Sequence, residues 1–207
     1  MSCKFVVGTG AMLDWALAAW REVAPGLDLV PLAMDTGADP AEVESLLAGR
    51  DLAGATAFVT ADARHLNFSR LERMTLYRLR GLPMPPLLCR GAVVAEGTVI
   101  GENSWIGAGA VVGQSCKVGF NSVVGAGAVL GHGSSVGNSC WIEDGVVLGR
   151  ESRLGAHVTL GAGVVVRSGV SVGKLCVIDK PGRIDADVAA KTFIHAHYAQ
   201  PMVIVGS

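Results

Sequence analysis

The chain has 207 residues, of which half are hydrophobic and 28 are glycine, and its formal net charge is −1. This length is enough for two small domains. The balanced charge, without a basic patch, argues against nucleic acid as a partner, and no apolar stretch is long enough to span a membrane. The first residues lack a secretory pattern, so a cytoplasmic protein is expected.

Residues 1–81 are predicted to form a small Rossmann-like βαβαβα domain with a parallel sheet. The predicted strands span residues 4–7, 27–32 and 55–60, and the predicted helices span residues 12–23, 41–47 and 68–80. Gly8 and Gly10 form the turn after the first strand, where a phosphate can bind at a helix N-terminus. Asp35, after the second strand, suits a ribose hydroxyl. Glycine in this turn also serves close packing, and Leu13 replaces the last glycine of a full dinucleotide fingerprint, so both interpretations stay open.

Residues 82–183 carry a six-residue repeat. Every sixth residue from Val94 to Ile178 is a large aliphatic, through fifteen hexads without an insertion. This predicts a parallel β-helix in which each hexad is a short strand and a corner. With the aliphatic as position one, position five is small and faces inward too. Position four is Gly or Asn in nine hexads, as a turn with positive φ requires. Three hexads close a coil of eighteen residues, which gives about five coils.

Other side chains of the repeat follow from their positions. Three cysteines occupy the small inward position and are predicted to be core residues rather than disulfides, ligands or nucleophiles: Cys116, Cys140 and Cys176. Trp105 and Trp141 share an outward position two coils apart. They are predicted to be buried at a trimer interface or to form a wall for pantetheine or substrate. In the C-terminal segment, residues 184–207, Asp185 is predicted to cap a helix that ends near Tyr198, before a short strand at 201–205.

Several motifs point to one family. They are Gly8-Thr9-Gly10, Asp35, Ala61-Asp62-Ala63-Arg64 with Arg70 and Arg73, Val129-Leu130-Gly131-His132 before Val136-Gly137, Leu148-Gly149 and Leu154-Gly155. The chain resembles the bacterial sialic-acid O-acetyltransferase and UDP-4-amino-sugar N-acetyltransferase family over about residues 4–180. The resemblance implies a left-handed β-helix, a homotrimer, acetyl-CoA or another acyl-CoA as co-substrate, and a sugar nucleotide held by the first domain. It also makes His132 the general base, and Trp141, Gly149 and Gly155 candidate acyl-CoA contacts.

His132 stands at hexad position three, an exposed corner, with Gln114 one coil before and Arg150 one coil after. A nearby cation favours the neutral imidazole that a base needs. The family has an acid directly after its His, an Asn seven residues before it and a second His nine residues after it. Here these positions hold Gly133, Gly125 and Trp141. The candidates to orient His132 are therefore Gln114, or Glu143 and Asp144 from a neighbouring subunit.

The resulting hypothesis is an acyl-CoA-dependent transferase that acylates an amino or hydroxyl group of a sugar nucleotide by direct transfer at trimer interfaces. The alternative is a non-catalytic β-helix scaffold or sugar-nucleotide-binding protein. A β-helical carbonic anhydrase would need three histidines for zinc. Only His132 and His157 lie in the repeat, so no metal is expected. The sugar, the acyl group and the choice between N- and O-acylation stay open.

Overall fold

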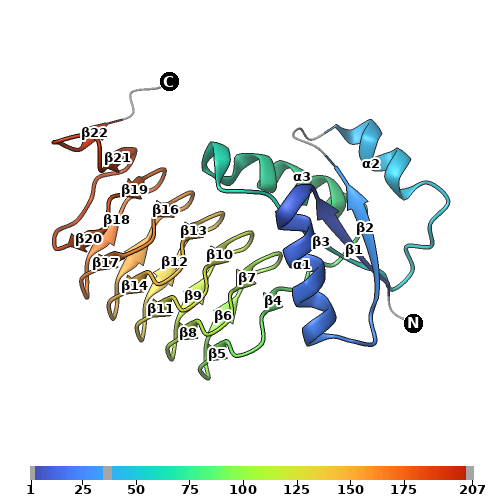
Figure 1. Cartoon of the computed structure of the whole chain (residues 1–207), viewed down its shortest axis with the longest axis horizontal. Helices are drawn as coiled ribbons and strands as arrows, with labels where there is room; N and C mark the ends of the chain where they lie inside the picture. Colours follow the sequence, from blue (N-terminus) through green and yellow to red (C-terminus); the bar gives the residue numbers. More distant parts are fainter. Residues whose placement is uncertain (1–2, 35–38, 204–207) are drawn as a thin grey trace.

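The computed structural model describes residues 3–34 and 39–203, in which an N-terminal α/β region precedes a β-helix (Figure 1). The α/β region contains β1 (Cys3–Gly8), α1 (Gly10–Val23), β2 (Asp28–Ala33), α2 (Pro40–Leu47), β3 (Thr56–Val59), the 3-10 helix η1 (Arg64–Asn67) and α3 (Phe68–Leu79). Its strands form a parallel sheet in the order β2-β1-β3. The predicted βαβαβα order is therefore confirmed.

Helical spacing decides which face of each helix is buried. Leu13, Ala16, Leu17 and Trp20 of α1 are all buried, and they pack in one cluster with Phe58 of β3. α2 begins with Pro40, and the Asp39 carboxylate accepts a hydrogen bond from the Ala41 N–H, which caps the helix. α2 and α3 contribute to a second cluster around β1, β2 and β3. Hence helices cover both faces of the small sheet, as a parallel sheet requires.

The β-helix has three faces, each a sheet of very short strands. The tryptophan face contains β4 (Leu87–Leu88), β7 (Trp105–Ile106), β10 (Val123–Val124), β13 (Trp141–Ile142), β16 (Thr159–Leu160), β19 (Val177–Asp179), β21 (Thr192–His195) and β22 (Met202–Val203). The valine face contains β5 (Val93–Val94), β8 (Val111–Val112), β11 (Val129–Leu130), β14 (Val147–Leu148), β17 (Val164–Val166) and β20 (Gly182–Ile184). The polar face contains β6 (Val99–Ile100), β9 (Lys117–Val118), β12 (Ser135–Val136), β15 (Arg153–Leu154) and β18 (Ser171–Val172).

The register of the coils is the predicted one. Val112, Leu130 and Leu148 pair in parallel across β8, β11 and β14, and each is at most 1% exposed. The cysteines of the repeat are buried and free, and burial raises the pKa of the Cys140 thiol to about 12. The solenoid starts one hexad earlier than predicted, at β4, and it continues past Ile178. It therefore has about six coils instead of five.

Two hexad positions need special backbone, for different reasons. At position four the φ angle is positive in fourteen of the fifteen hexads, even where the residue is neither Gly nor Asn, as at Glu151 and His157. At position two the reason is space. A Cβ on Gly113 would lie 2.8 Å from the His132 nitrogen of the next coil. The candidate acyl-CoA glycines, Gly149 and Gly155, occupy this position, and a Cβ on either would collide with the backbone of the next coil.

The predicted C-terminal helix is wrong. Residues 184–198 form no helix; β21 pairs in parallel with β19, which places Ile194 beside Ile178, and β22 turns back antiparallel on β21. Ile184, Val188 and Ile194 pack against the core of the β-helix. The open end of the solenoid leaves apolar side chains and strand edges without partners, and pairing with them outweighs the local helical preference. No helix in residues 3–34 or 39–203 is long and apolar enough to cross a membrane.

Side chains of the α/β region fix it to the solenoid. The buried Arg70 guanidinium of α3 donates to three main-chain oxygens: those of Val59 (3.1 Å), Asn121 (2.9 Å) and Asn103 (2.6 Å). Burial lowers the pKa of Arg70 to about 9. Trp105 packs edge-on against Phe58, with ring centroids 6.0 Å apart. The outward Trp105 is thus covered by its own chain, and no trimer interface is needed to bury it.

Candidate functional site

His132 lies at the corner between the valine face and the polar face, directly after β11. Its side chain is exposed, and its Nδ1 accepts a hydrogen bond of 3.0 Å from the Gln114 N–H of the previous coil. In the neutral imidazole the proton therefore sits on Nε2. The Gln114 side chain has no part in this contact. The predicted neighbour thus orients the imidazole through its backbone.

A cavity of about 540 Å³ opens at this corner, lined by His132, Arg150, Glu151, Ser168 and Gly169. Glu151 was missed in the sequence, although it stands eighteen residues after Gly133 and hence stacks on it. A Cβ on Gly133 would lie 3.4 Å from Cγ of Glu151. The side chain of Glu151 therefore brings a carboxylate beside the position where the resembled family has its acid.

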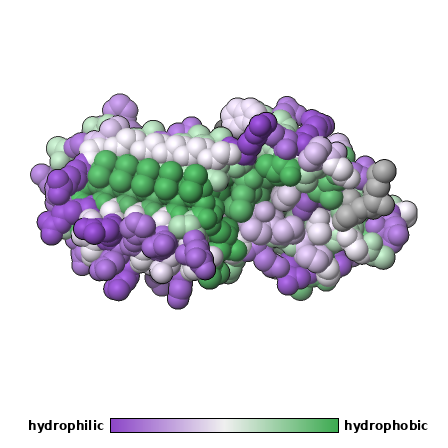
Figure 2. All heavy atoms as spheres, turned by 90° about the horizontal axis from the view of Figure 1, so that it is seen from below, coloured by the Kyte–Doolittle hydropathy of each residue, from purple (hydrophilic) through white to green (hydrophobic). Residues whose placement is uncertain are grey.

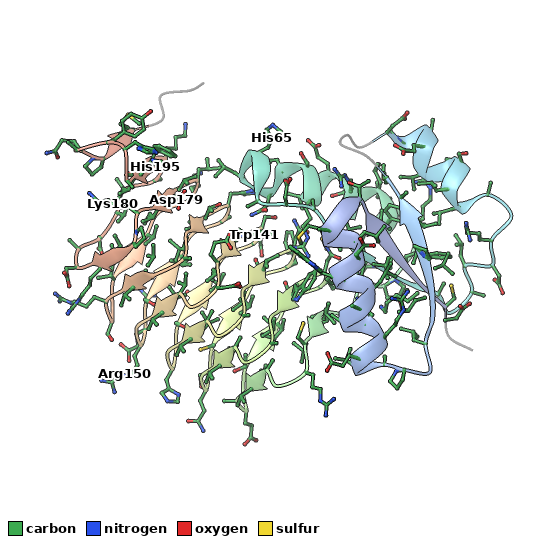
Figure 3. The ribbon with its side chains drawn as sticks, in the orientation of Figure 1. His65, Trp141, Arg150, Asp179, Lys180 and His195 are labelled. Carbon is green, nitrogen blue, oxygen red and sulfur yellow. The ribbon has the colours of Figure 1, made fainter. Side chains whose placement is uncertain are left out.

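Glu143 and Asp144 lie at the other edge of the valine face, at the corner that precedes β14. Glu143 Oε1 accepts a hydrogen bond of 2.7 Å from the indole N–H of Trp141, and Asp144 Oδ1 accepts one of 2.7 Å from the Ala126 N–H. Glu143 occupies hexad position two, which is Gly in eleven of fifteen hexads. Figure 3 shows Trp141 and Arg150 at different edges of the β-helix. Within one protomer, these carboxylates and His132 belong to separate cavities.

A cavity of about 450 Å³ separates α1 from the tryptophan face. It is lined by Met12 and Trp15 of α1 and by residues of the β-helix that include Trp105, Trp141, Glu143 and Asp144. Trp141 therefore forms part of a cavity wall, one of the two roles predicted for it. Met12 and Trp15 had no signal in the sequence beyond helical spacing, because only the docking of α1 beside the β-helix creates this space.

A third cavity, of about 640 Å³, lies at the N-terminus of α1 and shares Met12 and Trp15 with the cavity at the tryptophan face. Its other lining residues are Thr9, Gly10, Ala11, Ala61, Asp62, His65, Ser69 and Arg73. Gly10 has φ 55° and starts α1. Gly8 packs against Thr60, where a Cβ would collide with the threonine hydroxyl. Asp35 lies outside the described residues. Gly10 therefore lines the predicted phosphate site, whereas Gly8 has a packing role beside it.

Two arginines after β3 have different surroundings. Arg70 has the three carbonyl partners described above and is structural. Arg73 is 3% exposed and lines the cavity at α1; its Nη1 donates to the Thr60 carbonyl over 3.4 Å. Its Nε has no hydrogen-bond partner among the described residues. A guanidinium that lines a cavity is suited to an anionic ligand.

The turn between β3 and α3 is held against the β-helix. Its residues His65, Leu66 and Asn67 all have left-handed backbone, which costs a residue with a Cβ about 1–2 kcal/mol. The Leu66 carbonyl accepts a hydrogen bond of 2.7 Å from Nδ1 of His157, and Asn67 donates to the Ser139 carbonyl over 3.0 Å. His157, predicted only as a turn residue, thus contacts the α/β region. The sequence analysis singled out the motif Ala61-Asp62-Ala63-Arg64 before this turn, but it did not predict that His65 lines the cavity.

The outer surface of the valine face is an apolar stripe. Five valines stand eighteen residues apart on it, and four are between 36% and 56% exposed: Val93, Val111, Val129 and Val165, with Val147 half-buried between them. Figure 2, which views the molecule from below, shows hydrophobic surface running along the β-helix. On the polar face, Lys117, Ser135, Arg153 and Ser171 stand among the corresponding positions. Val99 is the one apolar residue among these outward positions, so a continuous apolar stripe is found on the valine face, which separates His132 from Glu143 and Asp144.

Metal ligands were not expected, and the described residues contain no group of three or more His, Cys, Asp or Glu side chains that could hold a metal ion. His195 and His197 lie on and after β21. Nε2 of His195 is 3.6 Å from the Asp179 carboxylate, and His195 Nδ1 accepts a hydrogen bond from the His197 N–H. These contacts position His195 within the C-terminal strand pair.

Comparison with known proteins agrees with the repeat and with the fold. Residues 97–132 and 133–168 match the model of bacterial transferase hexapeptide repeats. No curated protein sequence matches the chain significantly.

Solved structures resemble nearly the whole chain. PerB from Caulobacter crescentus, in complex with CoA and GDP-perosamine, is 19% identical with a TM-score of 0.77 and covers 93% of each chain. The acetyltransferase domain of PglB from Neisseria gonorrhoeae is 17% identical with a TM-score of 0.79, over 98% of this chain and 100% of that domain. AntD, an N-acyltransferase from Bacillus cereus, is 12% identical with a TM-score of 0.53, over 63% of this chain and 89% of its own. Residues 97–168 thus match the hexapeptide-repeat model, and the chain has a two-part fold similar to those of PerB and PglB, as the sequence motifs predicted.

Proposed function

We propose that the protein is a cytoplasmic acyl-CoA-dependent acyltransferase, with acetyl-CoA as donor and an amino or hydroxyl group of a sugar nucleotide as acceptor. The observation that carries the proposal is the pair of adjoining cavities along α1. One ends at a helix N-terminus beside Arg73, which suits a diphosphate. The other ends at Trp141 and Glu143, which leaves room for the sugar. Similar structures hold CoA together with GDP-perosamine or with an amino-sugar nucleotide, which supports the same pair of ligands here.

A homotrimer completes the site in this proposal. The exposed valine stripe suits the surface around a three-fold axis, because burying it removes apolar area from water. If three valine faces surround such an axis, each protomer's corner with His132 meets its neighbour's corner with Glu143 and Asp144. The two groups of residues that one chain keeps apart then face one cleft. This arrangement agrees with the prediction that Glu143 and Asp144 act from a neighbouring subunit.

In the proposed reaction His132 takes a proton from the acceptor amine or hydroxyl, whose nitrogen or oxygen attacks the thioester carbonyl. The carbon–sulfur bond then breaks, and the CoA thiolate leaves and takes up the proton from the His132 imidazolium. Nδ1 of His132 accepts the Gln114 N–H and Nε2 carries the proton, so the imidazole must rotate away from Gln114 before it accepts another. Glu151 supplies the negative charge that stabilises the resulting imidazolium. Arg150, in the same cavity, favours the neutral imidazole beforehand.

The same hydrogen bond supports the second candidate, a non-catalytic sugar-nucleotide-binding protein, because it leaves His132 without a free lone pair. Turnover of acetyl-CoA with a panel of 4-amino-sugar nucleotides separates the two functions. We expect His132→Ala to lower turnover by about 10²–10⁴-fold while acetyl-CoA binding stays unchanged. Wild-type turnover in this variant would refute the role of His132, and absence of acetyl-CoA binding by the wild-type protein would favour the non-catalytic function.

Subunit mixing tests the shared site. The variants His132→Ala and Glu143→Gln are each expected to have low turnover alone. When they are unfolded and refolded together, mixed trimers contain some clefts with both native residues, and part of the turnover should return. Mixing His132→Ala with Glu151→Gln provides the matched control. Those two positions lie at one corner of the same chain, so each cleft takes both residues from one protomer. Every cleft in a mixed trimer therefore still carries one of the two substitutions, and no turnover is expected to return.

A further inference from the structure

The turn between β3 and α3 has a strained backbone. His65, Leu66 and Asn67 have φ angles of 52°, 51° and 61°, and none of them is glycine. Three left-handed residues in succession are unfavourable because each Cβ crowds the following carbonyl. Such strain persists only where neighbouring groups hold the backbone in place, and it is common at functional sites.

The β-helix supplies the groups that hold this turn. The Leu66 oxygen is an acceptor only, so His157 Nδ1 is the donor in their 2.7 Å hydrogen bond. The His157 ring also stacks on Phe68, with centroids 4.0 Å apart and planes 12° from parallel. Asn67 is anchored through the Ser139 carbonyl. One histidine on a corner of the solenoid therefore contacts both the middle of the turn and the first residue of α3.

The other end of this arrangement is the cavity at α1. His65 and Ser69 line this cavity, and the reaction proposed above gives neither of them a role. The same cavity contains the N-terminus of α1, a helix of fourteen residues, and the buried Arg73 with its unpartnered Nε. Helix N-terminal N–H groups and a guanidinium are both phosphate ligands. Asp62, which also lines the cavity, suits a ribose hydroxyl.

We propose that His65 contacts the diphosphate of the acceptor nucleotide, and that His157 is a positioning residue that holds the His65–Asn67 turn in the binding conformation. The inference rests on the proposed function for the identity of the acceptor. It predicts that a side chain outside the cavity, on the β-helix, sets the affinity of the α/β region for a nucleoside diphosphate. Figure 3 shows His65 at the start of the helical segment that lies over the β-helix.

Isothermal titration of the full chain with UDP, GDP and dTDP in turn, and separately with CoA, tests this inference. His65→Ala removes the direct contact and should weaken binding of the preferred nucleotide by about 10-fold or more. His157→Ala should weaken it by about 10-fold, within the usual range for coupling between sites, and leave the affinity for CoA unchanged. His157→Asn keeps a donor near the position of Nδ1 and tolerates positive φ, so it should restore most of the affinity.

Leu175→Ala is the matched control. Leu175 occupies the same hexad position one coil later, with φ 62°, so its truncation disturbs the same corner. Equal nucleotide affinity in wild type and His157→Ala, or equal losses in His157→Ala and Leu175→Ala, would overturn the role of His157. If the wild-type protein binds CoA but none of the three nucleotides, the inference fails and the acyltransferase proposal needs another acceptor. If it binds a nucleotide but not CoA, the inference survives and the proposed function fails.

Discussion

Lys4 is a buried cation with no anion beside it among the described residues, and its replacement should stabilise the protein. The residue lies in β1 and is 2% exposed. Its Nζ has no hydrogen-bond partner among the described residues, and it lies 4.1 Å from the centroid of the Trp20 ring. Burial lowers the pKa of Lys4 from 10.5 to about 8. Folding at neutral pH therefore has to remove a charged ammonium group from water.

The size of the effect follows from the pKa. The difference between 10.5 and 8 corresponds to about 3 kcal/mol, at 1.36 kcal/mol for each pKa unit. The contact between the ammonium and the Trp20 ring offsets about 1 kcal/mol of this cost. Lys4→Met keeps a long side chain and removes the charge. We expect it to raise the free energy of unfolding at pH 7 by about 2 kcal/mol.

The gain should depend on pH in one direction. The folded-state pKa lies below the unfolded one, so between pH 8 and 10.5 the unfolded wild-type chain binds more protons than the folded chain. Wild-type stability therefore rises through that window relative to the variant. The difference between the two proteins is fully present below pH 8 and closes as the pH approaches 10.5.

Urea unfolding followed by circular dichroism at several pH values between 7 and 10 measures this difference. Lys174→Met serves as the control, because Lys174 is exposed and its replacement should change stability little at any pH. A Lys4→Met variant less stable than the wild type at pH 7 would refute the reasoning. So would a difference that stays constant from pH 7 to pH 10.

Three further predictions concern the β-helix. Gly127→Val should lower the free energy of unfolding by about 1–3 kcal/mol, because Gly127 has φ 63° and a β-branched residue resists that conformation; an unchanged melting temperature would exclude this. Val129→Asp should convert the proposed trimer to monomers in sedimentation equilibrium, since it places a charge on the apolar stripe, whereas Ser135→Asp on the polar face should leave the proposed trimer intact; equal behaviour of the two would argue against the valine face as the interface. Glu151→Gln should lower turnover by about 10-fold without changing the affinity for acetyl-CoA, because it removes the charge that stabilises protonated His132; wild-type turnover would exclude that role.

The repeat could be predicted because every hexad carries the same constraints. An inward aliphatic, a small inward partner and a residue tolerant of positive φ recur at fixed spacing, so tertiary contacts and local preference agree. Eighteen-residue stacking also places Glu151 on Gly133, and it could have identified Glu151 from the sequence. In the C-terminal segment, local preference and tertiary contacts disagree. Its local helical preference is overridden by pairing with the strand edges of the last coil, and the local sequence pattern gives no sign of this pairing.

The sites in the α/β region were predictable only in part. Glycines after the first strand indicate a phosphate site, and Gly10 does line a cavity. The left-handed turn at His65 has no local signal, because non-glycine residues adopt it only when distant contacts hold them. Arg70 and Arg73 are equivalent in the sequence pattern. Their roles separate only because α3 directs one into main-chain carbonyls of the β-helix and leaves the other beside the cavity.

In the proposed acyltransferase, the attachment of α3 through Arg70 also fixes the position of the acceptor along the β-helix. Arg70 engages Asn103 and Asn121, which belong to two adjacent coils, so α1 and its cavities stand at a defined height along the solenoid. Successive coils rise by about 4.8 Å, whereas reacting atoms must approach to about 3–3.5 Å. In that proposal, moving the attachment by one coil would carry the acceptor out of reach of His132. Because the main-chain oxygens that Arg70 engages recur once in each coil, the α/β region can be attached to the β-helix only in steps of one coil.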